Sequence, residues 1–127
     1  MKHEELTERI IGAFFEVHNA LGFGFLEKVY ENSLCVEFER RGILFSQQVP
    51  VRVEYCGRLV GDYVADLVVE NLVIVEVKAV KTILPSHEAQ LVNYLKATGL
   101  EVGLLLNFGP SAKVVRKVFD KGLTRGG

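Results

Sequence analysis

Three charged residues interrupt apolar sequence in a pattern that could support metal chemistry. Asp66 and Glu76 break two of the most apolar runs of the chain, and Lys78 follows Glu76 by two positions. Charged side chains are rarely buried without a partner, and residues two apart on a strand leave the same face. Two carboxylates converging with a lysine would form a site for a hard divalent cation, with a cationic group beside it. The alternative is two acidic residues at strand ends, with Lys78 as a surface salt-bridge partner.

This site depends on the connection between the two strands. A strict two-residue turn at Glu70-Asn71 would place Asp66 opposite Val75. Glu76 would then point to the other face, since a one-residue shift flips a whole strand. A three-residue connection, or a bulge, instead pairs Asp66 with Glu76. Asn71 tolerates the left-handed conformation that such a turn requires, so we expect this geometry.

Two polar residues on the next helical segment are candidates to join the site. Gln90 and Tyr94 are four apart, which places them on one face of a helix. Their side chains can hydrogen-bond a lysine, a water molecule or a phosphate. The alternative is an ordinary amphipathic helix with Tyr94 in the core.

A glycine turn near the N-terminus carries a further acidic residue. Gly24 is followed at intervals of three by Glu27 and Tyr30. Glu27 is either an acid that favours the N-terminus of a helix electrostatically or a third carboxylate for the metal. The glycines do not form a phosphate-binding P-loop, because no Lys-Ser/Thr pair follows them.

Hydrophobic periodicity predicts the elements that would position these residues. A hairpin meander followed by a helical crossover implies an α/β fold with a mixed sheet flanked by helices. Ser86 is the expected N-cap of the third helix, and Cys56-Gly57 is the expected hairpin turn. Helices are predicted over 4–20, 26–40, 86–96 and 111–119, and strands over 49–55, 58–69, 72–77 and 101–107.

Length and composition indicate an ordinary globular protein. The 127 residues suit a single domain, 1–127. Apolar residues make up 49% and charged residues 24% of the chain, close to the globular average. No stretch reaches the roughly 18 apolar residues of a membrane span, and the acidic N-terminus lacks a signal core. We therefore expect a cytoplasmic protein without membrane contact. Two cysteines are too few for a disulfide framework.

Charge is distributed unevenly along the chain. Residues 1–76 contain 7 Lys/Arg and 13 Asp/Glu, whereas residues 77–127 contain 8 and 3. The basic half is suited to face a polyanion, although the net charge of −1 does not predict strong non-specific DNA binding. The candidate phosphate contacts are Lys81, Lys96, Lys113, Arg116 and Lys117. Lys113, Arg116 and Lys117 share one face of the predicted final helix, which could equally be a solvated face.

Taken together, the motifs resemble those of the GxxExxY protein family, small bacterial and archaeal proteins placed in the PD-(D/E)xK nuclease superfamily. The resemblance covers roughly residues 4 to 119. The residue before Asp66 is Ala65, where the superfamily pattern has proline. The matching motifs are residues 18–30, Asp66, Glu76-Val77-Lys78, residues 90–96 and residues 103–109.

The resemblance implies a fold and a set of roles. The fold is a restriction-endonuclease-like αβββαβ core. Asp66 and Glu76 would hold Mg²⁺ or Mn²⁺ with the Val77 carbonyl, and Glu27 would be a further metal ligand. Lys78 would assist the attacking water, as catalytic lysines do in such nucleases. Gln90 and Tyr94 are similar to the accessory motif of the recombination-exonuclease branch.

We therefore expect a divalent-metal-dependent nuclease that acts on nucleic acid, with DNA ahead of RNA. A second copy of the chain is a candidate partner, because a domain this small often needs one to grip a duplex. Two alternatives remain open. One is an intact nuclease fold that binds nucleic acid without cutting it, and the other is an interaction protein within a defence or repair complex.

Overall fold

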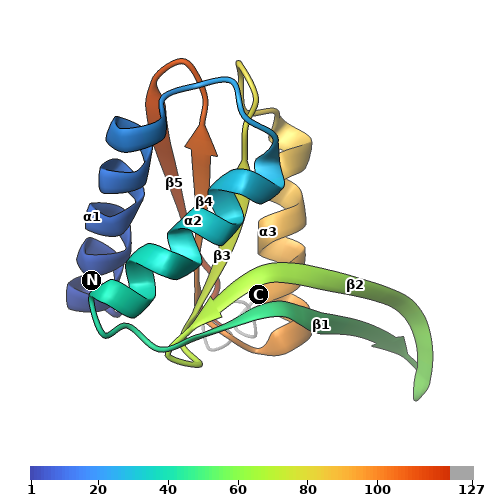
Figure 1. The fold of residues 1–127 in the computed structure, drawn as a ribbon. Coiled ribbons are helices and arrows are strands. Elements are labelled where there is room, and N and C mark those ends of the chain that lie inside the picture. Colours follow the sequence, from blue (N-terminus) through green and yellow to red (C-terminus); the bar gives the residue numbers. More distant parts are fainter. Residues whose placement is uncertain (121–127) are drawn as a thin grey trace.

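A five-stranded sheet and three helices form the part of the chain that the computed structural model describes, residues 1–120 (Figure 1). Residues 121–127, the end of the expected 1–127 domain, lie outside the described residues. None of these helices has the length and apolar character needed to span a membrane. The elements are α1 (Glu4–Leu21), α2 (Glu27–Arg40), β1 (Phe45–Tyr55), β2 (Arg58–Val69), β3 (Val73–Lys78), α3 (Pro85–Thr98), β4 (Val102–Phe108) and β5 (Ala112–Val118).

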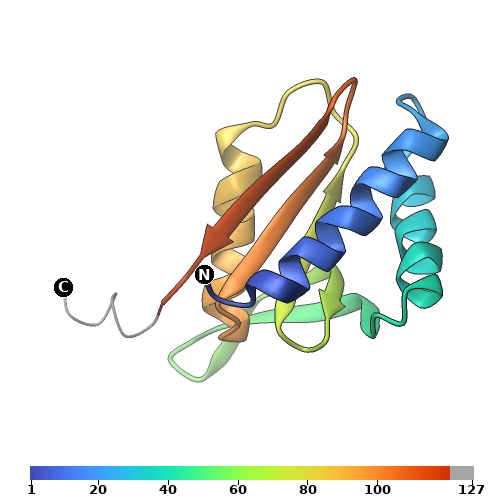
Figure 2. The same ribbon diagram turned by 90° about the vertical axis from the view of Figure 1, so that its left-hand side faces the viewer.

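The strands lie in the order β1-β2-β3-β4-β5. Only the pair β3–β4 is parallel, and α3 makes the crossover between them. Figure 2 shows α1 and α2 on one face of the sheet and α3 on the other. The expected α/β fold with a mixed sheet and flanking helices is confirmed.

The central strands are buried on both faces, as their continuous apolar sequence predicts. All seven residues of β4 are buried. Leu104 and Leu106 belong to the apolar cluster under α1 and α2, whereas Leu105 belongs to the cluster under α3. This alternation follows from the period of two along a strand, and it divides the core into two layers.

The start of α3 differs from the prediction. The helix begins at Pro85, so Ser86 lies inside it and is not its N-cap. Proline is favoured at the first helical position because it needs no hydrogen bond for its nitrogen there. The Leu84 amide donates to Nδ1 of His87 at 3.0 Å, so the imidazole of His87 takes the capping role.

The predicted final helix over 111–119 is wrong, because this segment is the edge strand β5. Its residues pair antiparallel with β4, from Phe108 opposite Ala112 to Val102 opposite Val118. Val114 packs against the α1–α2 cluster and Val115 against the α3 cluster, an alternation that a helix would not give. Burial of β-branched residues on a strand outweighs the helical spacing of the basic residues.

Two consequences follow for the basic residues of this segment. Lys113 and Lys117 lie on one face of the strand and Arg116 on the other, so the expected shared face does not exist. Lys117 Nζ instead pairs with a carboxylate oxygen of Glu88 at 2.7 Å, and the Arg116 guanidinium donates to the Lys2 carbonyl.

The β1–β2 hairpin extends beyond the rest of the sheet and runs below α3 (Figure 1). We call residues 49–65 the arm. Its tip is the predicted two-residue turn, with Cys56 and Gly57 both at positive φ, 51° and 76°. The arm therefore adds a second wall beside α3, which the strand order alone does not reveal.

Candidate active site

The turn between β2 and β3 sets the register of the site. Val69 pairs with Val73 and Leu67 with Val75, so three residues, 70–72, connect the strands. Glu70 and Asn71 have φ values of 55° and 58°, the left-handed conformation expected for Asn71. The three-residue connection is confirmed, and continuing its register places Asp66 level with Glu76.

The two carboxylates bridge the strands reciprocally. The backbone amide of Asp66 donates to Oε2 of Glu76 at 2.8 Å, and the amide of Val77 donates to Oδ2 of Asp66 at 2.7 Å. The backbone pairing of β2 with β3 ends at Leu67 and Val75. Beyond that pair, the two carboxylates bond the strands to each other in place of backbone carbonyls. Within residues 1–120, the second oxygen of each carboxylate makes no hydrogen bond.

Burial makes this pair a strong acceptor of positive charge. Glu76 is 5% exposed, and burial, together with the nearby charge of Asp66, raises its pKa to about 8. Burial also raises the pKa of Asp66, while the Val77 amide and the Lys78 ammonium act in the opposite direction. Two desolvated carboxylates side by side favour either a shared proton or a cation.

The donor set fits a hard divalent cation. Carboxylate and carbonyl oxygens are the ligands that Mg²⁺ takes, and Mg²⁺ usually retains several waters beside one or two carboxylates. Asp66 and Glu76 offer two such carboxylates, and the Val77 carbonyl is the expected third ligand. Among residues 1–120, however, no three His, Cys, Asp or Glu side chains form a ready-made metal cluster. Glu27 is exposed, and its charge raises the pKa of both acids, so it lies within electrostatic range without completing a cluster.

Lys78 ends β3 two residues after Glu76, on the same face of the strand. It is half-buried, and its charge lowers the pKa of both carboxylates. Among residues 1–120, no carboxylate oxygen lies within 4.0 Å of the Lys78 ammonium nitrogen. The ammonium is therefore close enough to influence the acids without being held by another partner.

Sequence reasoning missed a second acid near the site, Glu31. Its side chain is buried and accepts hydrogen bonds from Lys28 at 3.1 Å, Gln47 at 2.6 Å and Gln48 at 2.9 Å. Its charge raises the pKa of Asp66. The available signal was its spacing of four from Glu27, which puts both acids on one helical face.

Tyr30 of the glycine motif has a structural role. Its hydroxyl donates to the Gly22 carbonyl at 2.5 Å and accepts from the Phe25 amide at 3.2 Å. Its ring stacks on Phe108, with centroids 4.4 Å apart. The motif therefore fixes the turn before α2, and that turn holds Glu27 at the start of the helix.

The segment after Lys78 is anchored by a buried amide. Asn107 is 2% exposed; its Oδ1 accepts from the Val80 amide at 3.0 Å, and its Nδ2 donates to the Val80 carbonyl at 2.9 Å. Gly109 allows this approach, because a Cβ there would lie 2.5 Å from the Val80 carbonyl oxygen. Asn107 thus continues the sheet beyond β3 through its side chain.

Gln90 and Tyr94 line a groove of about 1040 Å³ between α3 and the arm. Burial raises the pKa of Tyr94, and the charges of Glu76 and Asp66 raise it further. Tyr94 therefore lines the groove and lies within electrostatic range of the acidic pair. Of the candidate phosphate contacts, Lys96 lines the groove, whereas Lys81 and Lys113 are exposed elsewhere.

Solved structures of known proteins share this fold. Among solved structures, SSO0001 gives a TM-score of 0.58 at 18% identity, over 76% of this chain and 52% of its own. This chain thus spans about half the length of SSO0001. An alkaline exonuclease from Laribacter hongkongensis gives a TM-score of 0.56 at 9% identity, over 99% of this chain and 75% of its own. At these identities the likeness shows the fold.

A search of curated proteins found no match. A family model described as the PD-(D/E)XK nuclease superfamily matches residues 4–118, which include the acidic pair, Lys78 and the whole sheet. The chain therefore belongs to the PD-(D/E)XK nuclease superfamily.

Proposed function

We propose that this chain is a divalent-metal-dependent nuclease that hydrolyses phosphodiester bonds, with DNA the expected substrate ahead of RNA. One observation carries the proposal: buried Glu76 and half-buried Asp66 lie side by side across β2 and β3, with Lys78 on the same strand face as Glu76. Such a pair is costly for the folded chain unless a cation or proton compensates it.

The proposed roles divide between holding and positioning. Asp66, Glu76 and the Val77 carbonyl hold Mg²⁺ or Mn²⁺, and Glu27 contributes at most through water. The bound ion would make a water nucleophilic at neutral pH and neutralise charge on the scissile phosphate. Lys78 orients the attacking water or stabilises the negative charge that develops in the transition state.

The test compares Lys78→Ala with a matched lysine variant. Wild type is expected to nick plasmid or degrade single-stranded DNA when Mn²⁺ or Mg²⁺ is added, and to stop in EDTA. Lys78→Ala should lose about 10²- to 10³-fold in rate, the usual cost of removing one transition-state donor. Lys2→Ala is the control, because Lys2 pairs with Glu101 at 3.4 Å, away from the acidic pair.

Two results would count against the proposal. Equal rates for wild type and Lys78→Ala would remove Lys78 from the reaction. Mn²⁺ binding that depends on Glu76, measured by calorimetry, without cleavage of any nucleic acid would indicate a binding module on the same fold.

A further inference from the structure

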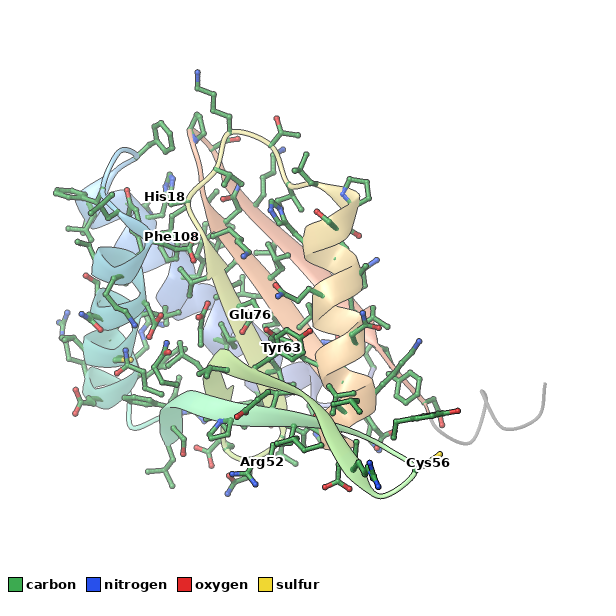
Figure 3. The ribbon with its side chains drawn as sticks, turned by 90° about the vertical axis from the view of Figure 1, so that its right-hand side faces the viewer. His18, Arg52, Cys56, Tyr63, Glu76 and Phe108 are labelled. Carbon is green, nitrogen blue, oxygen red and sulfur yellow. The ribbon has the colours of Figure 1, made fainter. Side chains whose placement is uncertain are left out.

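The groove beside the acidic pair has two walls from different parts of the chain. The arm supplies residues of β1 and β2, and α3 supplies the other wall. Figure 3 shows this side of the molecule, with Arg52 and Tyr63 on the arm and Cys56 at its tip. At about 1040 Å³, the groove is slightly larger than the roughly 300–1,000 Å³ range of pockets for drug-sized ligands.

Two tyrosine rings that line this groove are in contact, one from the arm and one from α3. The ring centroids of Tyr63 and Tyr94 are 6.0 Å apart, with the rings tilted by 44°. Tyr94 is only 6% exposed, whereas Tyr63 is 48% exposed. Gly61 leaves room for the Tyr63 ring, since a Cβ there would lie 2.9 Å from its Cε2. The structure thus supports an aromatic ring that remains open to a ligand.

The polar residues of the groove suit nucleotides. Gln90 and Asn93 can donate to and accept from base edges. Lys96 can contact phosphates, and Glu54 is the one acid among the lining residues. A lining with aromatic, amide and basic side chains is typical of sites for unpaired nucleotides.

We infer that this groove binds a single strand of nucleic acid, with one base stacked on Tyr63, and leads that strand to the Asp66–Glu76 pair. This inference rests on the proposed nuclease function. A duplex keeps its base faces covered by stacking, so an open aromatic ring gains little from it. An unpaired strand presents those faces, and DNA and RNA share this chemistry.

The experiment measures binding in EDTA, so that no strand is cut. The probes are fluorescent oligomers of thymidylate, uridylate, a duplex, and an abasic phosphodiester chain of the same length. Tyr63→Ala should weaken binding of the single strands about 5- to 140-fold, the loss of one base–aromatic stack. Tyr63→Phe should retain binding because it keeps the ring.

Tyr55→Ala is the matched control. Tyr55 lies near the tip of the same arm, is 72% exposed and does not line the groove, so its loss should leave binding unchanged. Tighter binding of thymidylate than uridylate, or the reverse, would identify the natural strand, and either result with a Tyr63 dependence supports the groove.

Three results would overturn the inference: Tyr63→Ala binding single strands as wild type does, Tyr63→Ala weakening duplex and abasic probes equally, or Tyr55→Ala having the same effect as Tyr63→Ala. Failure of the nuclease proposal is read separately. Tyr63-dependent binding without cleavage in Mn²⁺ would support the strand-binding groove and contradict the nuclease proposal. Cleavage at a rate that does not depend on Tyr63 would support the nuclease proposal and contradict the groove.

Discussion

The two ends of β2 differ sharply in burial although they belong to one strand. Leu67 and Val69 are 0% exposed, whereas Leu59 and Val60, on the arm, are 51% and 63% exposed. The buried end carries Asp66, next to Glu76 of β3, and the exposed arm carries Tyr63. The difference suggests that the proposed chemistry needs the rigid core, while recognition can use an element with few tertiary contacts.

The packing of β2 against the two core clusters changes at Asp66. Ala65 packs in the cluster under α3, but Leu67 packs in the cluster under α1 and α2, which breaks the simple alternation of a strand. Gln48 lies between the paired positions that flank Asp66 and has a φ of 55°. Left-handed backbone at a non-glycine residue is strained and often marks a functional site. Here the strands turn at the residue that we propose as a metal ligand.

The largest effect that we expect concerns the buried end. Without divalent cation, the free energy of unfolding should fall as pH rises from about 4.5 to about 8. In the folded chain the pKa of Glu76 is about 8, against 4.5 for an ordinary glutamate. Between these values the folded state binds more protons than the unfolded state, so rising pH favours unfolding. The stabilisation that the Glu76 proton gives the folded state is complete below pH 4.5 and lost above about pH 8. The raised pKa of Asp66 makes stability change with pH in the same direction.

Thermal melts in EDTA across that pH window measure this effect. Glu76→Gln should flatten the dependence, because the amide has no proton to lose. Mn²⁺ should stabilise wild type most at the alkaline end, since the ion competes with the proton for the same oxygens. An identical pH dependence in wild type and Glu76→Gln would show that Glu76 is not the group responsible.

The next test compares the same residue at the two ends of β2. Leu67→Ala should lower the free energy of unfolding by about 2–5 kcal/mol, because it opens a cavity in the core. Leu59→Ala should change it by no more than about 0.5 kcal/mol, as expected for an exposed site. Urea denaturation measures both. Equal losses at the two positions would mean that the arm is packed as tightly as the core, and the comparison drawn above would fail.

The sequence predicted the parts of the site that depend on local rules. Continuous apolar runs indicated the buried strands β3 and β4, and the left-handed tolerance of Asn71 predicted the turn that brings Asp66 level with Glu76. Both signals lie within a few residues of the feature that they determine. These signals therefore predicted a mixed α/β sheet, and the resemblance of the motifs to a known family implied the superfamily core.

The missed features depend on long-range packing. Residues 112–118 fit a helix by the spacing of their basic residues, and only pairing with the edge of β4 decides for a strand. Glu31 looks like a surface acid until Gln47 and Gln48 of β1 are placed over it. The groove exists because the arm turns at Asp66 toward α3, and no local pattern encodes that turn.

The smallest effect that we expect tests whether the buried end needs an anchor beyond its strands. Asn107→Ala would leave both the amide and the carbonyl of Val80 without their partner, and should cost about 1–3 kcal/mol of stability. Because Val80 follows Lys78 by two residues, the variant should also lower kcat more than it raises KM. Asn32→Ala is the control, since its hydrogen bond with Gln47 is exposed and water can replace it. If both variants unfold at the same urea concentration and cleave at the same rate, the Asn107 amide does not hold this segment, and the position of Lys78 would have to follow from β3 alone.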